Sequence, residues 1–175
     1  HEPNKAMNLN SYMGLFGGKF TVESRENKKY LRHIDIGRAA LHVPDTDYVI
    51  TLDADSILVP AYAVRLVHEM EREENQRLAV IRTPYSVFPN ASGRLERIAG
   101  ATTDIQFIIH QGFTGFNGTY WVGANALLRK TALDDIEEKD TERGFEIKRY
   151  IQDRTVIEDT ESSVDLVDKG WRLHN

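Results

Sequence analysis

The sequence predicts an α/β domain with a mainly parallel sheet flanked by helices. Short, nearly continuous apolar runs, such as residues 48–52 and 78–81, alternate with stretches whose apolar residues recur at helical spacing. Continuous apolar runs are typical of strands buried on both faces of a parallel sheet. The chain has 175 residues, 41% of them hydrophobic, and no internal repeat. We therefore expect one domain spanning residues 1–175.

The first quarter of the chain predicts helical structure. Residues 5–10 are short and polar and indicate a turn that enters a helix. Residues 27–43 carry Leu31, Ile34 and Leu41 at roughly helical spacing, which predicts a second helix.

A buried strand follows at residues 48–52, after a turn signal, and it ends at Asp53-Ala54-Asp55. Pro60 suits the first turn of the next helix. The apolar stripe of that helix is formed by Val64, Val67 and Met70.

The second half of the chain repeats the alternation. Residues 78–81 predict a strand, and Ser92 is placed to cap a helix. Residues 158–169 predict a helix, and Gly170 suits the position that follows its end. The helix after Ser92 is expected to turn Leu95, Ile98 and Ile105 inward. The segments between the helices are expected to be a loop at 112–117, a strand or buried turn at 121–128, an exposed charged segment at 134–144 and extended chain at 150–157.

Composition excludes several classes of protein. The net charge of −5 argues against general nucleic-acid binding, because no excess of Lys and Arg displaces counterions from phosphates. The chain has no cysteine, so a disulfide framework, a zinc ribbon and a thiol nucleophile are all excluded. No stretch approaches the roughly 18 apolar residues that a membrane span needs.

The first candidate site is Asp53-Ala54-Asp55, directly after the buried strand. Alternate residues at a strand end can both face the crevice where open α/β sheets bind ligands. Two carboxylates there can hold Mg²⁺ or Mn²⁺, which takes its other ligands from water and substrate phosphates. A solvated loop or a helix cap is the alternative, because so short a motif also arises by chance.

The second candidate is Glu158-Asp159, at the start of a predicted helix. Asp159 could be a helix cap favoured by the helix dipole. Its functional interpretation is a general base, since a carboxylate at the mouth of a crevice can accept a proton from an attacking hydroxyl.

Two further segments could contact a ligand. Lys5 lies beside small residues and could meet a diphosphate as a point charge, or it could be an ordinary surface lysine. Residues 118–125 combine Tyr120 and Trp121 with Gly123, which suits a wall against a flat sugar ring. The alternative for Trp121 is a place in the core.

The order of these motifs resembles family 2 glycosyltransferases, and more closely the catalytic domain of bacterial cellulose synthases and their relatives. The resemblance runs from Lys5 to Arg172 with gaps. It rests on Lys-Ala-x-Asn-Leu-Asn at 5–10, the strand ending in Asp53-Ala54-Asp55, Arg82-Thr83-Pro84, Trp-Val-Gly-Ala-Asn at 121–125, and Glu158-Asp159 before Gly170-Trp171-Arg172.

The resemblance implies a GT-A fold, a Rossmann-like α/β domain, and a role for each matching residue. Asp53 and Asp55 would bind the metal and the nucleotide diphosphate, near Lys5. Glu158 and Asp159 match the family's Thr-Glu-Asp motif, in which Asp159 is the catalytic base. The residues that match substrate-binding segments are Thr83, Tyr120, Trp121, Gly123 and Ala124.

The resemblance further implies an inverting transfer of a sugar from a nucleotide-diphosphate sugar, with UDP-sugar expected, to a saccharide hydroxyl in polysaccharide synthesis. The cofactor would be Mg²⁺ or Mn²⁺. We expect the chain to be a piece of a longer protein whose other segments enter the membrane, with this part on the cytoplasmic face.

The sequence also departs from the family pattern. Ile157 replaces the usual Thr before Glu-Asp, and Arg82 replaces the usual Gln before Thr-Pro. Residues 11–43 form an insertion. We expect the family's first strand and its Gln-x-x-Arg-Trp segment to lie outside residues 1–175.

Two other classes of function compete with glycosyl transfer. A phosphatase could use Asp53 as a nucleophile, but the further Ser/Thr and Lys elements that it needs cannot be assembled from this sequence. A non-catalytic sugar-nucleotide-binding or assembly module of a membrane polysaccharide synthase would show affinity without turnover.

Overall fold

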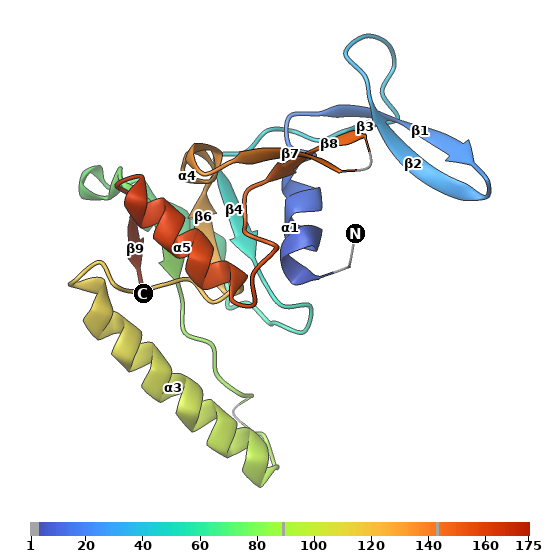
Figure 1. Cartoon of the computed structure of the whole chain (residues 1–175). Helices are drawn as coiled ribbons and strands as arrows, with labels where there is room; N and C mark the ends of the chain where they lie inside the picture. Colours follow the sequence, from blue (N-terminus) through green and yellow to red (C-terminus); the bar gives the residue numbers. More distant parts are fainter. Residues whose placement is uncertain (1–3, 89, 143) are drawn as a thin grey trace.

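A computed structural model of the chain describes residues 4–88, 90–142 and 144–175, and it is a mixed α/β structure (Figure 1). The helices are α1 Lys5–Met13, α2 Tyr62–Met70, a 3-10 turn η1 Glu73–Asn75, α3 Arg94–Thr114, α4 Lys130–Asp135 and α5 Glu158–Asp168. The strands are β1 Lys19–Arg25, β2 Lys28–His33, β3 Leu41–His42, β4 Tyr48–Thr51, β5 Leu78–Arg82, β6 Ala126–Arg129, β7 Glu138–Glu142, β8 Phe145–Arg149 and β9 Arg172–His174. No helix in these ranges is long and apolar enough to cross a membrane.

The central sheet has the strand order β4-β6-β5-β9. β6 is antiparallel to both β4 and β5, whereas β5 and β9 are parallel. The prediction of a mainly parallel GT-A sheet is therefore not confirmed, although β4, β5 and β9 all point the same way. The difference arises because β6 returns between β4 and β5, and an apolar run in a sequence does not encode the direction of its strand.

The carboxyl ends of β4 and β5 meet at one edge of this sheet. Thr51 at the end of β4 and Arg82 at the end of β5 both pair with Ala126, the first residue of β6. The residues that follow Thr51 and Arg82, and those that precede Ala126, must therefore gather at this edge. α5 leads through a tight turn at Gly170 (φ +79°) into β9, so the start of α5 returns to the same edge.

The predicted helix at residues 27–43 is wrong. This segment belongs to the β1–β2 hairpin and to β3, which form a separate three-stranded sheet. Glu26 and Asn27 both have positive φ angles, 49° and 62°, as a two-residue hairpin turn requires. Leu31 pairs across the hairpin with Val22, so the spacing that suggests a helix is incidental here.

Several predicted boundaries also shift. Pro60 precedes α2, which begins at Tyr62. Ser92 does not cap α3, whose cap residue is Gly93. The apolar side chains expected on its inner face, Leu95, Ile98 and Ile105, are exposed instead. At 121–128 both expected alternatives occur: residues 121–125 form a largely buried irregular segment, and β6 begins at Ala126. Residues 150–157 form no strand, and the segment 134–144 includes β7.

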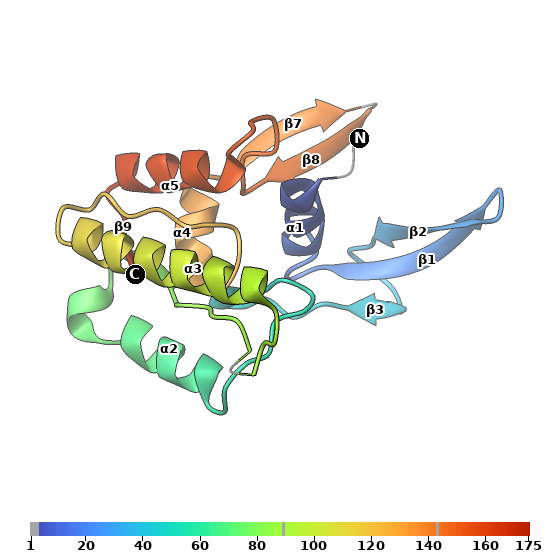
Figure 2. The same ribbon diagram turned by 90° about the horizontal axis from the view of Figure 1, so that it is seen from below.

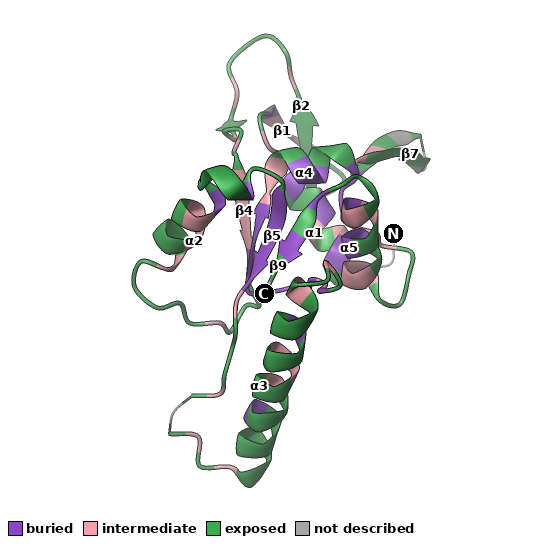
Figure 3. Cartoon of the chain, turned by 90° about the vertical axis from the view of Figure 1, so that its left-hand side faces the viewer, coloured by how far each residue is buried: buried purple, intermediate pink, exposed green. Residues whose placement is uncertain are grey.

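The core lies between the central sheet and the helices α1, α4 and α5 (Figure 3). Val80, Leu128 and Leu173 bring three strands together there, with Trp121 and Leu166 beside them. A smaller cluster lies against α2 and includes Met70 and Leu127. Figures 1 and 2 show the β1–β2 and β7–β8 hairpins reaching outward beside α1, away from this core.

Asn10 connects α1 to the segment after β8. Its buried side chain donates to the carbonyl of Ile151 at 2.7 Å and accepts from the N–H groups of Tyr150 and Ile151, each at 2.9 Å. The amide thus supplies hydrogen bonds that a neighbouring strand would otherwise provide, because buried backbone groups must be paired. This contact holds α1, and with it Lys5, beside the central sheet.

Candidate functional site

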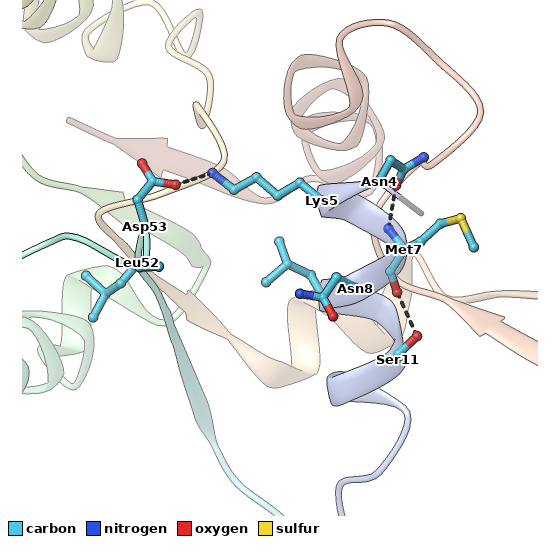
Figure 4. A pocket seen from close by; sticks show the side chains of 9 residues that line it. Asn4, Lys5, Met7, Asn8, Ser11, Leu52 and Asp53 are labelled. Atoms are coloured by element: carbon cyan, nitrogen blue, oxygen red, sulfur yellow. Dashed lines mark hydrogen bonds and ion pairs between the residues drawn. The ribbon is translucent and has the colours of Figure 1, made fainter. Parts of the chain in front are cut away.

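Lys5 and Asp53 meet across the edge of the central sheet. The Nζ atom of Lys5, in the first turn of α1, lies 2.6 Å from Oδ1 of Asp53, which follows β4 (Figure 4). Both side chains are about half exposed, so the pair is open to a ligand. They line a cavity of about 690 Å³ between α1 and the 52–54 loop, a size within the range of small-molecule sites.

Gly123 brings the start of α5 to the same place. A Cβ atom at Gly123 would lie 3.4 Å from Oδ2 of Asp159 and 3.4 Å from Nζ of Lys5. These two atoms are therefore no more than twice that distance apart, and Lys5 also touches Asp53. Asp53, Lys5, Gly123 and Asp159 thus converge from four separate stretches of the chain.

Hydrogen bonds fix the loops around this point. The N–H and the hydroxyl of Thr83 both donate to the carbonyl of Asn125 at 2.9 Å. The Thr83 hydroxyl also meets the Tyr62 hydroxyl at 2.8 Å. Ser56, in the loop that contains Asp53, donates to the side-chain oxygen of Asn125 at 3.4 Å. The strand ends and the loop that contains Gly123 are therefore connected directly.

Asp159 is half-buried in the first turn of α5, and its Oδ1 accepts the N–H of Thr160 at 2.7 Å. Burial raises the pKa of Asp159, and the neighbouring charge of Glu158 adds to the rise. Ser163, one turn further along, donates to the carbonyl of Asp159 at 2.7 Å and accepts the N–H of Trp121 at 3.0 Å. This serine ties the aromatic loop to the helix that positions Asp159.

The predicted substrate-binding residues divide by burial. Tyr120 and Thr83 are partly exposed at the site, whereas Trp121 is 2% exposed and belongs to the core. Trp121 therefore lies in the core, which was the alternative interpretation of this residue, and it has no free face for a sugar ring. Ala124 is buried as well.

The remaining acidic candidates lie near the edge but differ in contact. Asp55 is exposed and does not line the cavity beside Lys5 and Asp53. Glu158 is partly buried and acts on Asp159 through its charge.

In the sequence, Arg82 belongs to the Arg82-Thr83-Pro84 segment and departs from the usual Gln, but the sequence does not indicate it as a site residue. The structure places this side chain, 3% exposed, next to the site. Burial lowers the pKa of Arg82, while Tyr85, Tyr120 and Asp159 act on it electrostatically in the opposite direction. An arginine at the carboxyl end of a strand, before Thr-Pro, is the signal that could have indicated it.

Asp53 and Asp55 carry the only kind of oxygen donor, a carboxylate, that their side chains could offer to a cation. Mg²⁺ and Mn²⁺ prefer carboxylate oxygens as ligands. Asp53 contacts Lys5 through Oδ1, which leaves its Oδ2 for another ligand. Within the described ranges no group of three or more His, Asp or Glu residues forms a ready metal cage. Phosphate oxygens and water would therefore complete the coordination.

Residues 48–175 match the family model for glycosyl transferase family group 2. Because this match covers most of the chain, the chain belongs to that family, and its domain is a family 2 glycosyltransferase domain. A search of curated proteins found no match. Lys5 and the β1–β3 sheet lie before the matched range.

Proposed function

We propose that this domain is an inverting, metal-dependent hexosyltransferase that moves a sugar from a nucleotide-diphosphate sugar to a saccharide hydroxyl. The expected donor is a UDP-sugar. The reaction serves polysaccharide synthesis of the cellulose synthase type, at the cytoplasmic face of a membrane. Family membership supports the transfer chemistry. The observation that carries the proposal is the convergence of Asp53, Lys5 and Asp159 around Gly123.

In the proposed reaction Asp159 takes the proton from the acceptor hydroxyl. The acceptor oxygen forms a bond to the anomeric carbon from the face opposite the diphosphate. The bond from that carbon to the diphosphate oxygen breaks, and its electron pair leaves on the phosphate. Inversion follows from this in-line displacement.

Charge that develops on the leaving diphosphate is met by Lys5. Its ammonium group is compact and flexible and lies beside Asp53, so it can turn from the carboxylate to a phosphate oxygen. Mg²⁺ or Mn²⁺ held by Asp53 and Asp55 would supply Lewis-acid stabilisation of the same phosphates. Tyr120 and Gly123 border the space in which the acceptor would lie.

The test compares Asp159→Asn, Asp53→Asn and the control Asp168→Asn, at the opposite end of α5. Asp159→Asn should lower kcat for sugar transfer by about 10²-fold or more while UDP binding persists, because only the base is lost. Asp53→Asn should abolish the Mn²⁺ dependence of UDP binding. Asp168→Asn should leave both properties unchanged.

Near-normal turnover by Asp159→Asn would remove its assignment as the base. UDP binding by the wild-type protein without hydrolysis or transfer of any UDP-sugar would instead identify a binding module. Both outcomes are measurable with radiolabelled UDP-sugar and a calorimetric titration of UDP.

A further inference from the structure

Arg82 is a buried cation, and two of its three guanidinium nitrogens lack a hydrogen-bond partner among the described residues. Its Nε and Nη1 atoms are inaccessible to solvent, and neither finds an acceptor in the part of the chain that the structure describes. Removing a charge from water is costly unless hydrogen bonds and an opposite charge replace the lost hydration. An uncompensated guanidinium at 3% exposure therefore needs a physical reason.

The surroundings of Arg82 place it on the site side of the sheet. Val80 and Arg82 are two residues apart on β5 and so share a face, and Val80 packs in the cluster that contains Trp121. His110 on α3 lies near enough for the charge of Arg82, together with burial, to lower the histidine pKa. His110 in turn packs edge-on against Tyr120 with ring centres 4.3 Å apart.

Other charges do not neutralise Arg82 at close range. Asp159, Tyr85 and Tyr120 act on it electrostatically, but no carboxylate among the described residues accepts a hydrogen bond from its Nε or Nη1 atom. One oxygen of Asp159 is already held by the N–H of Thr160. Lys130, by comparison, has a side chain that is 12% exposed and does have a carboxylate partner, Asp134.

We propose that Arg82 binds an oxyanion carried by the substrate, a carboxylate or a phosphate group, beside Asp159. This inference rests on the proposed function and names the chemistry of its substrate. A planar guanidinium with unpaired donors matches the two oxygens of such a group and binds them with charge-assisted hydrogen bonds.

Two sources could supply the oxyanion. The diphosphate of the donor is one, and the carboxylate of an acidic sugar, a uronic acid, is the other. Lys5 and Asp53 already lie together at the cavity, whereas Arg82 is grouped with Tyr120 and His110. This grouping favours the carboxylate of an acidic saccharide, and the experiment separates the two sources.

The experiment measures binding by calorimetry for the wild-type protein, Arg82→Gln, Arg82→Lys and the control Arg97→Gln, which removes an exposed arginine of α3. The probes are UDP, uridine, UDP-glucose and UDP-glucuronate, together with free glucuronate. If the oxyanion is a phosphate, Arg82→Gln should weaken UDP binding by about 10- to 100-fold and leave uridine unchanged. If it is a carboxylate, the same loss should affect UDP-glucuronate or glucuronate and spare UDP-glucose.

A second readout separates binding from a structural role. Without ligand, Arg82→Met should melt no lower than the wild-type protein, because it removes an uncompensated buried charge and keeps an apolar side chain of similar length. Arg82→Lys should keep part of the oxyanion affinity, because it keeps the charge but loses the planar fork.

Wild-type affinity of Arg82→Gln for all five probes would overturn the proposal, and so would an Arg82→Met variant that melts several degrees lower with unchanged affinities. Either result leaves the proposed function intact if Asp53→Asn still loses metal-dependent UDP binding. Unchanged metal-dependent UDP binding by Asp53→Asn, together with near-normal sugar transfer by Asp159→Asn, would instead overturn the proposed function itself.

Discussion

At the scale of single residues, Gly123 has a demanding position. Its φ angle is +79°, which disfavours residues with a Cβ, and the missing Cβ leaves the space between Asp159 and Lys5 open. Gly123→Ala should destabilise the protein by about 1 kcal/mol through backbone strain. It should also lower kcat/KM for sugar transfer by at least about 10-fold, because the methyl group would lie 3.4 Å from both Oδ2 of Asp159 and Nζ of Lys5.

Gly170→Ala is the matched control for Gly123→Ala. Gly170 has the same φ angle of +79°, but its nearest neighbour is the flexible side chain of Arg77 at the other end of α5. Its substitution should cost similar stability in a urea titration and leave kcat/KM unchanged. Equal activity losses in the two variants would mean that strain, and not the space beside Asp159, controls the rate.

Asp159 predicts a link between stability and pH. Because its pKa is raised in the folded protein, the fold favours the protonated carboxyl. The stability that this gives is complete below the unfolded pKa of 3.8 and is lost as pH rises through the folded pKa. Asp159→Asn should therefore unfold at higher temperature than the wild-type protein at pH 7, with the difference vanishing near pH 3.

The pH–rate profile of the wild-type enzyme should change in the same sense. A base must be ionised to accept a proton, so the acidic limb of kcat/KM should lie above the pH at which an ordinary aspartate titrates. An acidic limb at or below pH 3.8 would contradict the assignment of Asp159 as the base.

At the scale of secondary-structure elements, Arg129 on β6 connects four neighbouring elements, β4, α2, η1 and β5. Its guanidinium donates to the carbonyls of Leu78 at 3.0 Å, Met70 at 2.7 Å and Asn75 at 3.2 Å, and to the Tyr48 hydroxyl at 3.0 Å. Arg129→Ala leaves these acceptors without a donor and should lower the free energy of unfolding by about 3 kcal/mol.

Arg129→Lys tests whether geometry or charge matters at this position. A lysine keeps the charge but cannot reach carbonyls in several directions, so it should recover less than half of the lost stability. A lysine variant as stable as the wild-type protein in urea would show that charge alone suffices.

At the scale of the whole molecule, the β1–β2 hairpin is separable from the family domain. It lies outside the matched range. The N–H of Ala40 donates to the carbonyl of Phe20 at 2.9 Å, so the two ends of the segment 21–39 lie side by side. Replacing residues 21–39 with Asn-Gly should cost less than about 1 kcal/mol, or about 2–4 °C in melting temperature. A calorimetric scan should still show one cooperative transition.

Phe20→Ala provides the comparison for that deletion. Phe20 is retained in the shortened chain and is only 7% exposed, so its truncation should cost about 3 kcal/mol in either background. A shortened chain that fails to fold would show that the hairpin is part of the core structure.

The sequence by itself determined the α/β composition, the strands at 48–52 and 78–81, the helix at 158–169 with Gly170 after it, and the candidates Lys5, Asp53 and Asp159. These features depend on local periodicity and on the order of motifs, which a linear chain displays directly. The helix assigned to residues 27–43 failed because Leu31, Ile34 and Leu41 satisfy helical spacing by chance, while the turn at Glu26-Asn27 decides in favour of strands.

Only the tertiary structure decided the direction of β6, the burial of Trp121 and the isolation of Arg82. Strand direction depends on which segments pair, and burial depends on what packs from elsewhere in the chain. The proximity of Asp159 to Lys5 likewise arises because β4 and β5 end, and α5 begins, at one edge of the sheet, which is a property of the assembled fold.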